Sequence, residues 1–234
     1  MKVLVVGATG GSGRATVAEL VRRGHDVTAL SRHAAALTGP NVRGVDGDAT
    51  DPATVDALVA GQDAVVVTLG ISEDPVRVRL RGPAGTPIDV RSRGTRTVTD
   101  AMRRHGVRRI VVQSSYGVGS TRGQLPLGTR LVFALLLKPQ IADEERRTAE
   151  LRATDLDWVE VQPVYLTDDD VPQPAFTSLD GDIRSMKVSR AQVARVHADA
   201  IERTDVVRRT VAVSHDPATA GTTAPRRSTA PARR

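Results

Sequence analysis

"VLVVGATGGSGRATVAELVRRG", residues 3–24, joins an apolar run to a glycine cluster and then to a helical pattern. The apolar run is continuous and β-branched, which is typical of a buried strand. In the cluster, Gly7, Gly10 and Gly13 recur every three residues. In such a strand–turn–helix unit the first glycine permits a tight turn, the second lets the backbone approach a pyrophosphate, and the third lets the helix pack close to the strand. The stretch predicts a dinucleotide-binding turn; the alternative is an ordinary glycine-rich turn.

Apolar runs and helical patterns alternate along the rest of the chain. The predicted strands span residues 2–7, 26–32, 41–48, 63–70, 107–115, 156–163 and 208–215, and the predicted helices span 12–24, 51–61, 89–106, 140–154 and 189–202. Strands that alternate with helices imply a parallel sheet covered on both faces. We therefore predict one α/β domain over residues 1–215, with a Rossmann-like, doubly wound parallel sheet.

The charge is concentrated at the C-terminal end. The net charge is +6, and the last 18 residues hold four arginines and no acid, so the body carries only +2. The segment 216–234, rich in Pro, Ala, Thr and Arg, cannot bury enough apolar surface to become ordered, and we expect a disordered basic tail. Because the body is nearly neutral and the chain has few aromatic residues, we expect no nucleic-acid partner.

The cellular setting is indicated by what the sequence lacks. It has no cysteine, which excludes disulfides and thiolate chemistry and fits a cytoplasmic protein. The most apolar window, "LVFALLLKP" at residues 131–139, is too short to cross a bilayer, so we expect no membrane association. Met1 leads directly into a predicted strand, so we expect no secretory leader.

The ends of the second and third strands bear on which nucleotide is bound. An acid after the second strand would accept a hydrogen bond from the ribose 2′-OH of NAD, but this chain has Ser31 and Arg32 there. Arg32 can pair with a 2′-phosphate, which favours NADP(H); the alternative is an ordinary surface arginine. Asp48, after the third strand, is a candidate acceptor for the adenine amino group. The alternative is an Asx turn, or a cap for the helix that begins near Asp51, and this local role is compatible with the contact to adenine.

Five motifs occur in the order expected of one family: "GATGGSGR", "GHDVTALSR", "GDATD", "GVRRIVVQSS" and "LDWVEVQPVYLTD". Over about residues 1–205 the sequence resembles the atypical short-chain dehydrogenase/reductase-like proteins. The nearest groups are the NmrA-like NAD(P)H-binding proteins and the biliverdin reductase B/flavin reductase type. The resemblance implies a Rossmann-like sheet with a dinucleotide across the carboxyl ends of its strands.

The resemblance also implies the position of each part of the cofactor. The phosphates would lie at the glycine turn, the 2′-phosphate at Arg32, the adenine beside Asp48 and the adenosine ribose at the end of the fourth strand. The nicotinamide half would lie near the ends of the fifth and sixth strands. The implied cofactor-binding residues are Gly7, Thr9, Gly10, Gly11, Ser12, Gly13, Arg32, Asp48, Ala49, Leu69, Gly70, Ser115, Pro163 and Val164.

The sequence departs from typical short-chain dehydrogenases at the catalytic pair. Those enzymes use a Tyr-x-x-x-Lys set to transfer a proton, and no such set exists in this chain, where Ile141 and Glu144 or Glu145 take its place. Two candidate catalytic residues remain, Ser114 and Tyr165. Ser114 equally suits a cap, and Tyr165 a packed aromatic side chain with a solvated hydroxyl. Tyr116 is a further pocket candidate.

These observations favour an NADPH-dependent reductase of a flavin, a quinone or a similar conjugated small molecule, because such acceptors need no strong enzymic acid. Residues 131–137 and a long loop at 166–181 would form the far wall of the pocket. The alternative is a non-catalytic NADP(H)-binding sensor that acts through a protein partner; a sugar-nucleotide epimerase is a weaker option. We expect a monomer or homodimer. We expect no metal, since the five histidines lack ligand spacing and the acidic run at 167–170 suits a solvated loop.

Overall fold

The structure, a computed structural model, describes residues 1–70, 85–125 and 138–218. Strand β1 (Lys2–Val6) pairs in parallel with β2 (Asp26–Ser31) on one side and with β5 (Ala64–Val67) on the other. The sheet of the described residues runs in the order β3 (Thr38–Gly39), β4 (Val42–Asp46), β2, β1, β5, β6 (Arg109–Gln113), β7 (Asp157–Pro163), β11 (Arg209–Ser214) and β9 (Phe176–Ser178). Only the edge pairs β3–β4 and β11–β9 are antiparallel.

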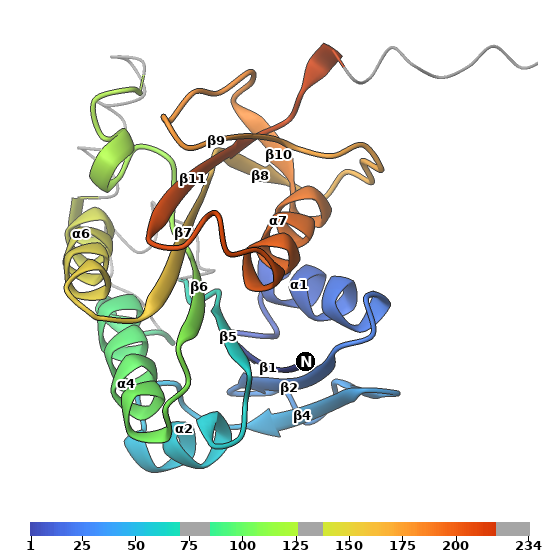
Figure 1. The fold of residues 1–234 in the computed structure, drawn as a ribbon, viewed down its shortest axis with the longest axis vertical. Helices are drawn as coiled ribbons and strands as arrows, with labels where there is room; N and C mark the ends of the chain where they lie inside the picture. The colour runs from blue at the N-terminus through green and yellow to red at the C-terminus, as the bar shows by residue number, and fades with distance from the viewer. Residues whose placement is uncertain (71–84, 126–137, 219–234) are drawn as a thin grey trace, which may run out of the picture.

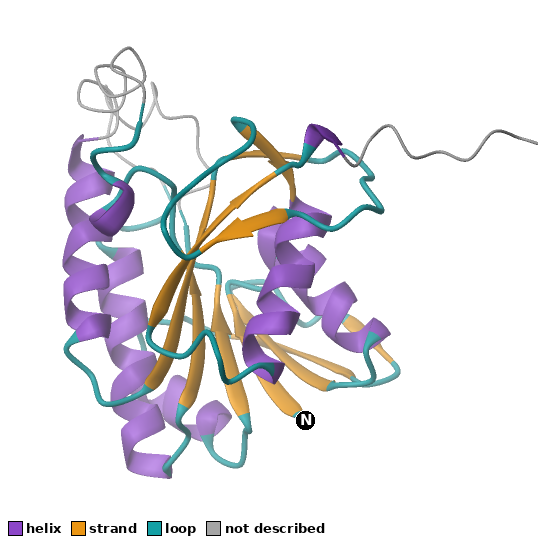
Figure 2. Cartoon of the chain, turned by 45° about the horizontal axis from the view of Figure 1, so that its top comes forward, coloured by secondary structure: helices purple, strands orange, loops and turns teal. Residues whose placement is uncertain are grey.

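Helices cover both faces of this sheet (Figures 1 and 2). Figure 1 shows α1 (Gly11–Arg22) beside α7 (Arg190–Glu202) on one face, and α2 (Pro52–Val59), α4 (Val90–His105) and α6 (Lys138–Arg152) on the other. Successive side chains of a strand point to opposite faces, so β1 contributes to two cores. Val3 and Val5 pack in the core under α1 and α7, whereas Leu4 and Val6 pack in the core under α2 and α4. The prediction of a doubly wound α/β sheet is confirmed.

The helix ends follow local sequence signals. Asp51 caps α2 by accepting hydrogen bonds from the backbone N–H groups of Ala53 and Thr54, with Pro52 at the first helical position. Ser189 and Gln192 form a capping box at the start of α7. Gly106 ends α4 in the left-handed conformation, with φ of 70°. Side-chain and backbone hydrogen bonds thus define where these elements begin and end.

All seven predicted strands are present, but one predicted loop is wrong. Residues 166–181 were expected to form a continuous loop, whereas β8 (Tyr165–Thr167) and β9 lie within or at the edge of this range. β8 pairs in parallel with β10 (Lys187–Ser189) to form a separate two-stranded sheet. Such three-residue strands are held by backbone pairing and are too short to show a hydrophobic period. Residues 131–137 and 219–234, predicted as pocket wall and tail, lie outside the described residues.

The connections place a topological switch beside β1. The chain leaves β1 through α1 toward β2, whereas α2 carries it from β4 back across to β5 on the other side of β1. The loops after β1 and β5 therefore diverge, which opens a crevice at the carboxyl ends of the strands. None of the helices in residues 1–70, 85–125 and 138–218 is long and apolar enough to cross a membrane.

Candidate functional site

A cleft of about 480 Å³ lies at this switch point, where β1, β2 and β5 end. Its size is within the range of small-molecule and cofactor sites. The predicted cofactor-binding residues that line it are Gly7, Thr9, Gly10, Gly11, Arg32, Asp48, Ala49, Leu69 and Gly70. Residues predicted from four separate strand ends are thus brought together in one cavity.

The three glycines of the turn have different geometries. Gly7 has φ of +86°, and a Cβ there would lie 2.9 Å from the carbonyl oxygen of Thr68. A Cβ at Gly13 would lie 2.2 Å from the carbonyl oxygen of Gly7, so the close packing of α1 on β1 requires glycine. A Cβ at Gly10 would meet only the carbonyl oxygen of Gly7, at 3.5 Å. Neighbouring protein atoms would therefore tolerate a side chain at position 10. Because Gly10 lines the cleft, the missing side chain leaves that space open to a ligand.

The N-terminus of α1 is suited to an anion. Within the described residues no side chain caps this helix, and its first turn contains no acidic residue. Gly10 is its N-cap, so the first backbone N–H groups point past a residue that has no side chain. Unpaired N–H groups and the positive end of the helix dipole favour phosphate here.

Polar groups follow β2 on the adjoining wall of the cleft. The hydroxyls of Thr9 and Ser31 are hydrogen-bonded to each other, which links the glycine turn to the end of β2. The Arg32 guanidinium donates hydrogen bonds to the carbonyl oxygen of Gly85 and, at 3.0 Å, to the Thr86 hydroxyl. Arg32 therefore spans the cleft from β2 to the segment before α4, with its charge at the edge.

Asp48 forms the turn that was one of its two predicted roles. Its Oδ1 atom accepts hydrogen bonds from the backbone N–H and the hydroxyl of Thr50, both at 2.8 Å. The expectation that Asp48 itself caps α2 is wrong, because Asp51 does so. Asp48 also lines the cleft, and its contact with adenine stays a prediction.

Several predicted residues do not line this cleft: Ser12, Gly13, Ser114, Ser115, Pro163, Val164 and Tyr165. Ser12 accepts a hydrogen bond from the Thr16 hydroxyl through its carbonyl oxygen, and Gly13 is buried under the turn. Ser115 is exposed. Pro163 accepts a hydrogen bond from the backbone N–H of Tyr116, and the backbone N–H of Val164 donates to Val213. The roles of Ser12 and Gly13 at the phosphates, and of the other residues at the nicotinamide, stay predictions.

The two candidate catalytic side chains have contrasting surroundings. Ser114 follows β6, is 4% exposed, and its hydroxyl has no hydrogen-bond partner among the described residues. Its backbone N–H donates to the carbonyl oxygen of Val161. Tyr165 lies on β8 and is 70% exposed, so it is not the packed aromatic that was the alternative. An unsatisfied buried hydroxyl and an exposed phenol thus stand at the ends of β6 and β7.

Tyr116 has a structural contact instead of a place in the cleft. Its hydroxyl donates a hydrogen bond to the carbonyl oxygen of Gly181 at 2.9 Å and lies 3.1 Å from Oε1 of Gln124. Burial, with a smaller contribution from the charge of Asp182, raises the pKa of this phenol. Tyr116 therefore ties the segment after β9 to the end of β6.

Glu144, one of the residues that stand where Tyr-x-x-x-Lys would be sought, is part of a buried charge network. Glu144 lies on α6 and pairs with Arg91 at 3.1 Å and with Arg147 at 2.7 Å. Arg147, only 2% exposed, also contacts Glu160 of β7 at 3.3 Å. Glu144 is held between two arginines, so it does not replace the missing proton donor.

Sequence reasoning missed other lining residues, among them Thr68, Thr86, Pro87 and Val90. Thr68 follows β5 as Gly7 follows β1, so its position at a strand end was a usable signal. Thr86 and Pro87 precede α4 and Val90 is its first residue, and this segment carries no motif. Its position at the cleft depends on tertiary packing, because α4 lies against α2 and α6 on one face of the sheet.

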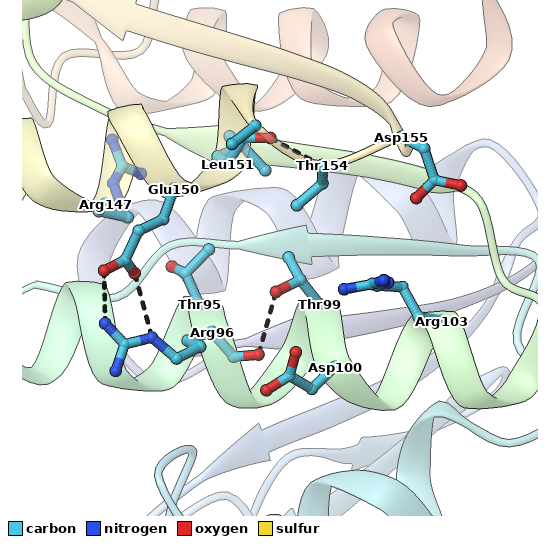
Figure 3. A pocket seen from close by; sticks show the side chains of 11 residues that line it. Thr95, Arg96, Thr99, Asp100, Arg103, Arg147, Glu150, Leu151, Thr154 and Asp155 are labelled. Carbon is cyan, nitrogen blue, oxygen red and sulfur yellow. Dashed lines mark hydrogen bonds and ion pairs between the residues drawn. The ribbon is translucent and has the colours of Figure 1, made fainter.

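A second cavity, of about 420 Å³, lies between α4 and α6 (Figure 3). It is lined by charges of both signs, including the Arg96–Glu150 ion pair, Arg103 and Asp155. It shares no lining residue with the cleft and contains no predicted site residue. Among the described residues no group of three or more His, Asp or Glu side chains is arranged to hold a metal ion. The cleft at the strand ends is therefore the candidate site.

Known proteins match this chain along most of its length. A family described as NAD(P)H-binding matches residues 7–204. An uncharacterized chloroplastic protein of Arabidopsis thaliana is 30% identical over 213 residues, covering 86% of this chain and 71% of the relative. The 2-alkyl-3-oxoalkanoate reductase of Stenotrophomonas maltophilia is 35% identical over 119 residues, which is 50% of this chain and 34% of that enzyme. The aligned part thus spans about a third of that reductase.

Solved structures share the fold. A wide-type short-chain dehydrogenase/reductase of Veillonella parvula in complex with NADP superimposes with a TM-score of 0.75 and 18% identity, covering 93% of this chain and 95% of that one. ChuY, an anaerobillin reductase of Escherichia coli O157:H7, gives a TM-score of 0.71 and 21% identity, covering 93% and 98%. The solved structures show that the fold is shared, and the family match shows that the chain belongs to the NAD(P)H-binding family.

Proposed function

We propose that this protein is an NADPH-dependent reductase of a flavin, a quinone or a similar conjugated small molecule. The observation that carries the cofactor half of the proposal is the cleft at the switch point, which combines an uncapped helix N-terminus with Arg32 at the end of β2. A basic side chain in place of an acid at this strand end supports a 2′-phosphate, and therefore NADP(H), over NAD(H).

The choice of acceptor follows from the side chains near the predicted nicotinamide end. A bound nicotinamide would supply the hydride. Ser114 has a buried hydroxyl without a partner among the described residues, which suits a hydrogen bond to the nicotinamide carboxamide or to a substrate oxygen. Tyr165 is exposed, so its phenol is accessible to a substrate. Because the sequence has no Tyr-x-x-x-Lys set to supply a proton, an acceptor that takes hydride into a conjugated system and its proton from solvent fits best, which favours flavins and quinones.

The names of similar proteins support the reductase class without naming the substrate. One relative is a 2-alkyl-3-oxoalkanoate reductase, and another, from a Streptomyces species, is a 3-diazoavenalumate denitrifying reductase that is 36% identical over 115 residues. The aligned part covers 38% of the latter enzyme. A shared reductase domain supports the same class of reaction on a different acceptor.

A second candidate is a non-catalytic NADP(H) sensor that acts through a protein partner. It is favoured by the missing Tyr-x-x-x-Lys set and by the position of Ser114 and Tyr165, neither of which lines the cleft. The sensor and the reductase share the same cofactor site, so only turnover separates them.

The experiment that tests the proposal is NADPH oxidation by the purified protein with a panel of free flavins and quinones, with cofactor binding titrated in parallel by fluorescence. The Gly10→Leu variant should lose both binding and turnover, because its side chain would enter the cleft while its Cβ meets only one backbone atom, at 3.5 Å. Gly39→Leu is the matched control, since a Cβ at Gly39 meets nothing within 4 Å and Gly39 is not a lining residue. Binding without turnover on any acceptor would favour the sensor.

A further inference from the structure

Arg190, the first residue of α7, lies over the start of α1. A Cβ at Gly11 would be 2.7 Å from Nε of Arg190, 2.9 Å from its Cδ and 3.3 Å from its Cζ. Gly11 is the first residue of α1 and lines the cleft. The Arg190 guanidinium therefore sits beside the helix N-terminus that the glycine turn opens to phosphate.

Gly11 is best explained by this arginine. Its φ is not in the left-handed region, so the backbone does not require glycine there. A side chain at position 11 would instead meet the Arg190 side chain, which would have to move to make room for it. The atoms nearest to the absent side chain all belong to Arg190. Position 11 thus accommodates a cation from another helix, 179 residues further along the chain.

The guanidinium of Arg190 uses only part of its hydrogen-bonding capacity within the described residues. Among the described residues its hydrogen bond goes from one terminal nitrogen to Oδ1 of Asp168, at 2.6 Å. The Asp168 side chain is 86% exposed, and ion pairs at the surface contribute little to the stability of a protein. A guanidinium carries five N–H donors and binds phosphate oxygens with two at a time. Nε and the second terminal nitrogen remain for an anion at the start of α1.

We infer that Arg190 is a further cofactor-binding residue that binds the pyrophosphate of the dinucleotide opposite the backbone N–H groups of α1. This inference rests on the proposed nucleotide site. The pyrophosphate would lie between a helix dipole on one side and a guanidinium on the other, so that both of its charges are met. β10 leads directly into Arg190, and β10 pairs with β8, which carries Tyr165. Arg190 thereby links the phosphates to the sheet that holds a candidate catalytic side chain.

The test is fluorescence titration of wild type, Arg190→Ala and Arg190→Lys with NADPH and with NADH. The pyrophosphate is common to both nucleotides. Arg190→Ala should therefore lower the affinity for NADPH and for NADH by a similar factor, roughly tenfold to a hundredfold. Arg190→Lys should give an intermediate loss, since it keeps the charge but not the fork. Arg203→Ala, which removes an exposed arginine just after α7, is the matched control and should bind like wild type.

A double-mutant cycle with Gly11→Ala separates the inferred contact from a general disturbance of the turn. In the wild-type background the new methyl group displaces the Arg190 side chain and should weaken both nucleotides. In the Arg190→Ala background the same methyl group displaces no arginine side chain, so the affinity for both nucleotides should change little. Circular dichroism and thermal melting of each variant confirm that the fold is retained.

The outcomes are distinct. Wild-type affinity in Arg190→Ala, or an equal cost of Gly11→Ala in both backgrounds, overturns the role of Arg190 and leaves the nucleotide site intact. A loss of affinity for NADPH alone also overturns the role of Arg190 at the pyrophosphate, since it would mean that Arg190 contacts the 2′-phosphate, which NADH lacks. If wild type binds neither nucleotide, the proposed nucleotide site fails and the role of Arg190 fails with it.

Discussion

Arg32 determines which nucleotide the cleft selects, in our proposal. Its guanidinium hydrogen-bonds Gly85 and Thr86 across the cleft, and these contacts hold the charge at the end of β2. A 2′-phosphate would offer the same donors a charged acceptor. Hydrogen bonds to charged groups are stronger than those to neutral ones, so the exchange favours the phosphorylated nucleotide.

Replacing Arg32 with alanine should therefore weaken NADPH much more than NADH. The expected loss for NADPH is roughly tenfold to a hundredfold, the range for a hydrogen-bonded charged group, with NADH changed little. Titration of both nucleotides measures the difference. Arg43→Ala, at an exposed arginine on neighbouring β4, serves as the control. An equal loss for both nucleotides would contradict the assignment of Arg32 to the 2′-phosphate.

Helix α6 is joined to the sheet by buried charges. Arg147 donates to the carbonyl oxygen of Gln113 at 3.0 Å and contacts the carboxylates of Glu144 and Glu160. Glu160 is fully buried on β7 and also accepts a hydrogen bond from Thr148, at 2.6 Å. Buried charges are tolerated only when they are paired, so the network depends on the balance between its members.

Removing Arg147 should be more harmful than removing Arg147 and the Glu160 charge together. Arg147→Met leaves Glu144 with Arg91 alone and Glu160 with Arg152 alone, and should lower the free energy of unfolding by about 2–3 kcal/mol. Adding Glu160→Gln should recover part of that loss, because it restores the charge balance. Urea unfolding measures both effects.

The control for this pair is an exposed ion pair between α6 and α4. Arg96 of α4 pairs with Glu150 of α6 on the surface, as Figure 3 shows, and its side chain is half exposed. Arg96→Met should cost less than about 1 kcal/mol, as exposed pairs do. Simple additivity of the Arg147 and Glu160 losses would show that charge balance is not what stabilises α6 on the sheet.

Global stability should depend on pH through His197. This side chain is fully buried where α7 packs on α1, and its Nδ1 atom lies 2.9 Å from the Thr16 hydroxyl. Burial lowers the pKa of His197 from 6.5 to about 3. Below pH 6.5 the unfolded chain therefore binds a proton that the folded protein does not, so stability falls as the pH drops from 6.5 toward 3.

Between pH 7 and pH 5.5, wild type should lose roughly 1 kcal/mol of unfolding free energy that a His197→Gln variant does not lose. The pH range is chosen to exclude Glu19, whose contribution to the unfolding free energy is also lost in acid. Its pKa is lowered to about 2, chiefly by the hydrogen bond from Arg22, so its contribution falls only below its unfolded pKa of about 4.5. Urea unfolding at the two pH values checks the difference. Equal losses in the two proteins would mean that His197 is not the responsible group.

Local sequence signals predicted the elements of the sheet well. β1, α1 and the glycine turn were predictable because a buried parallel strand, three spaced glycines and an amphipathic helix each have a local cause. The capping box at Ser189 and the cap at Asp51 are equally local. The cofactor half of the cleft followed, because the carboxyl ends of parallel strands meet at one edge of a sheet.

Tertiary structure decided what depends on contacts between distant residues. The β8–β10 sheet, the buried pairing of Glu144 and the tether from Tyr116 to Gly181 join segments whose partners no local pattern identifies. The same holds for Arg190 and Gly11: one looks like an ordinary helical arginine and the other like one glycine among several, until packing of α7 on α1 brings them together. The sequence by itself determined the strands, the turn and the nucleotide-binding edge, because these follow from backbone conformation and hydrophobic period. Which charges meet at that edge was decided only when the helices packed, because electrostatic pairing depends on distance in space and not along the chain.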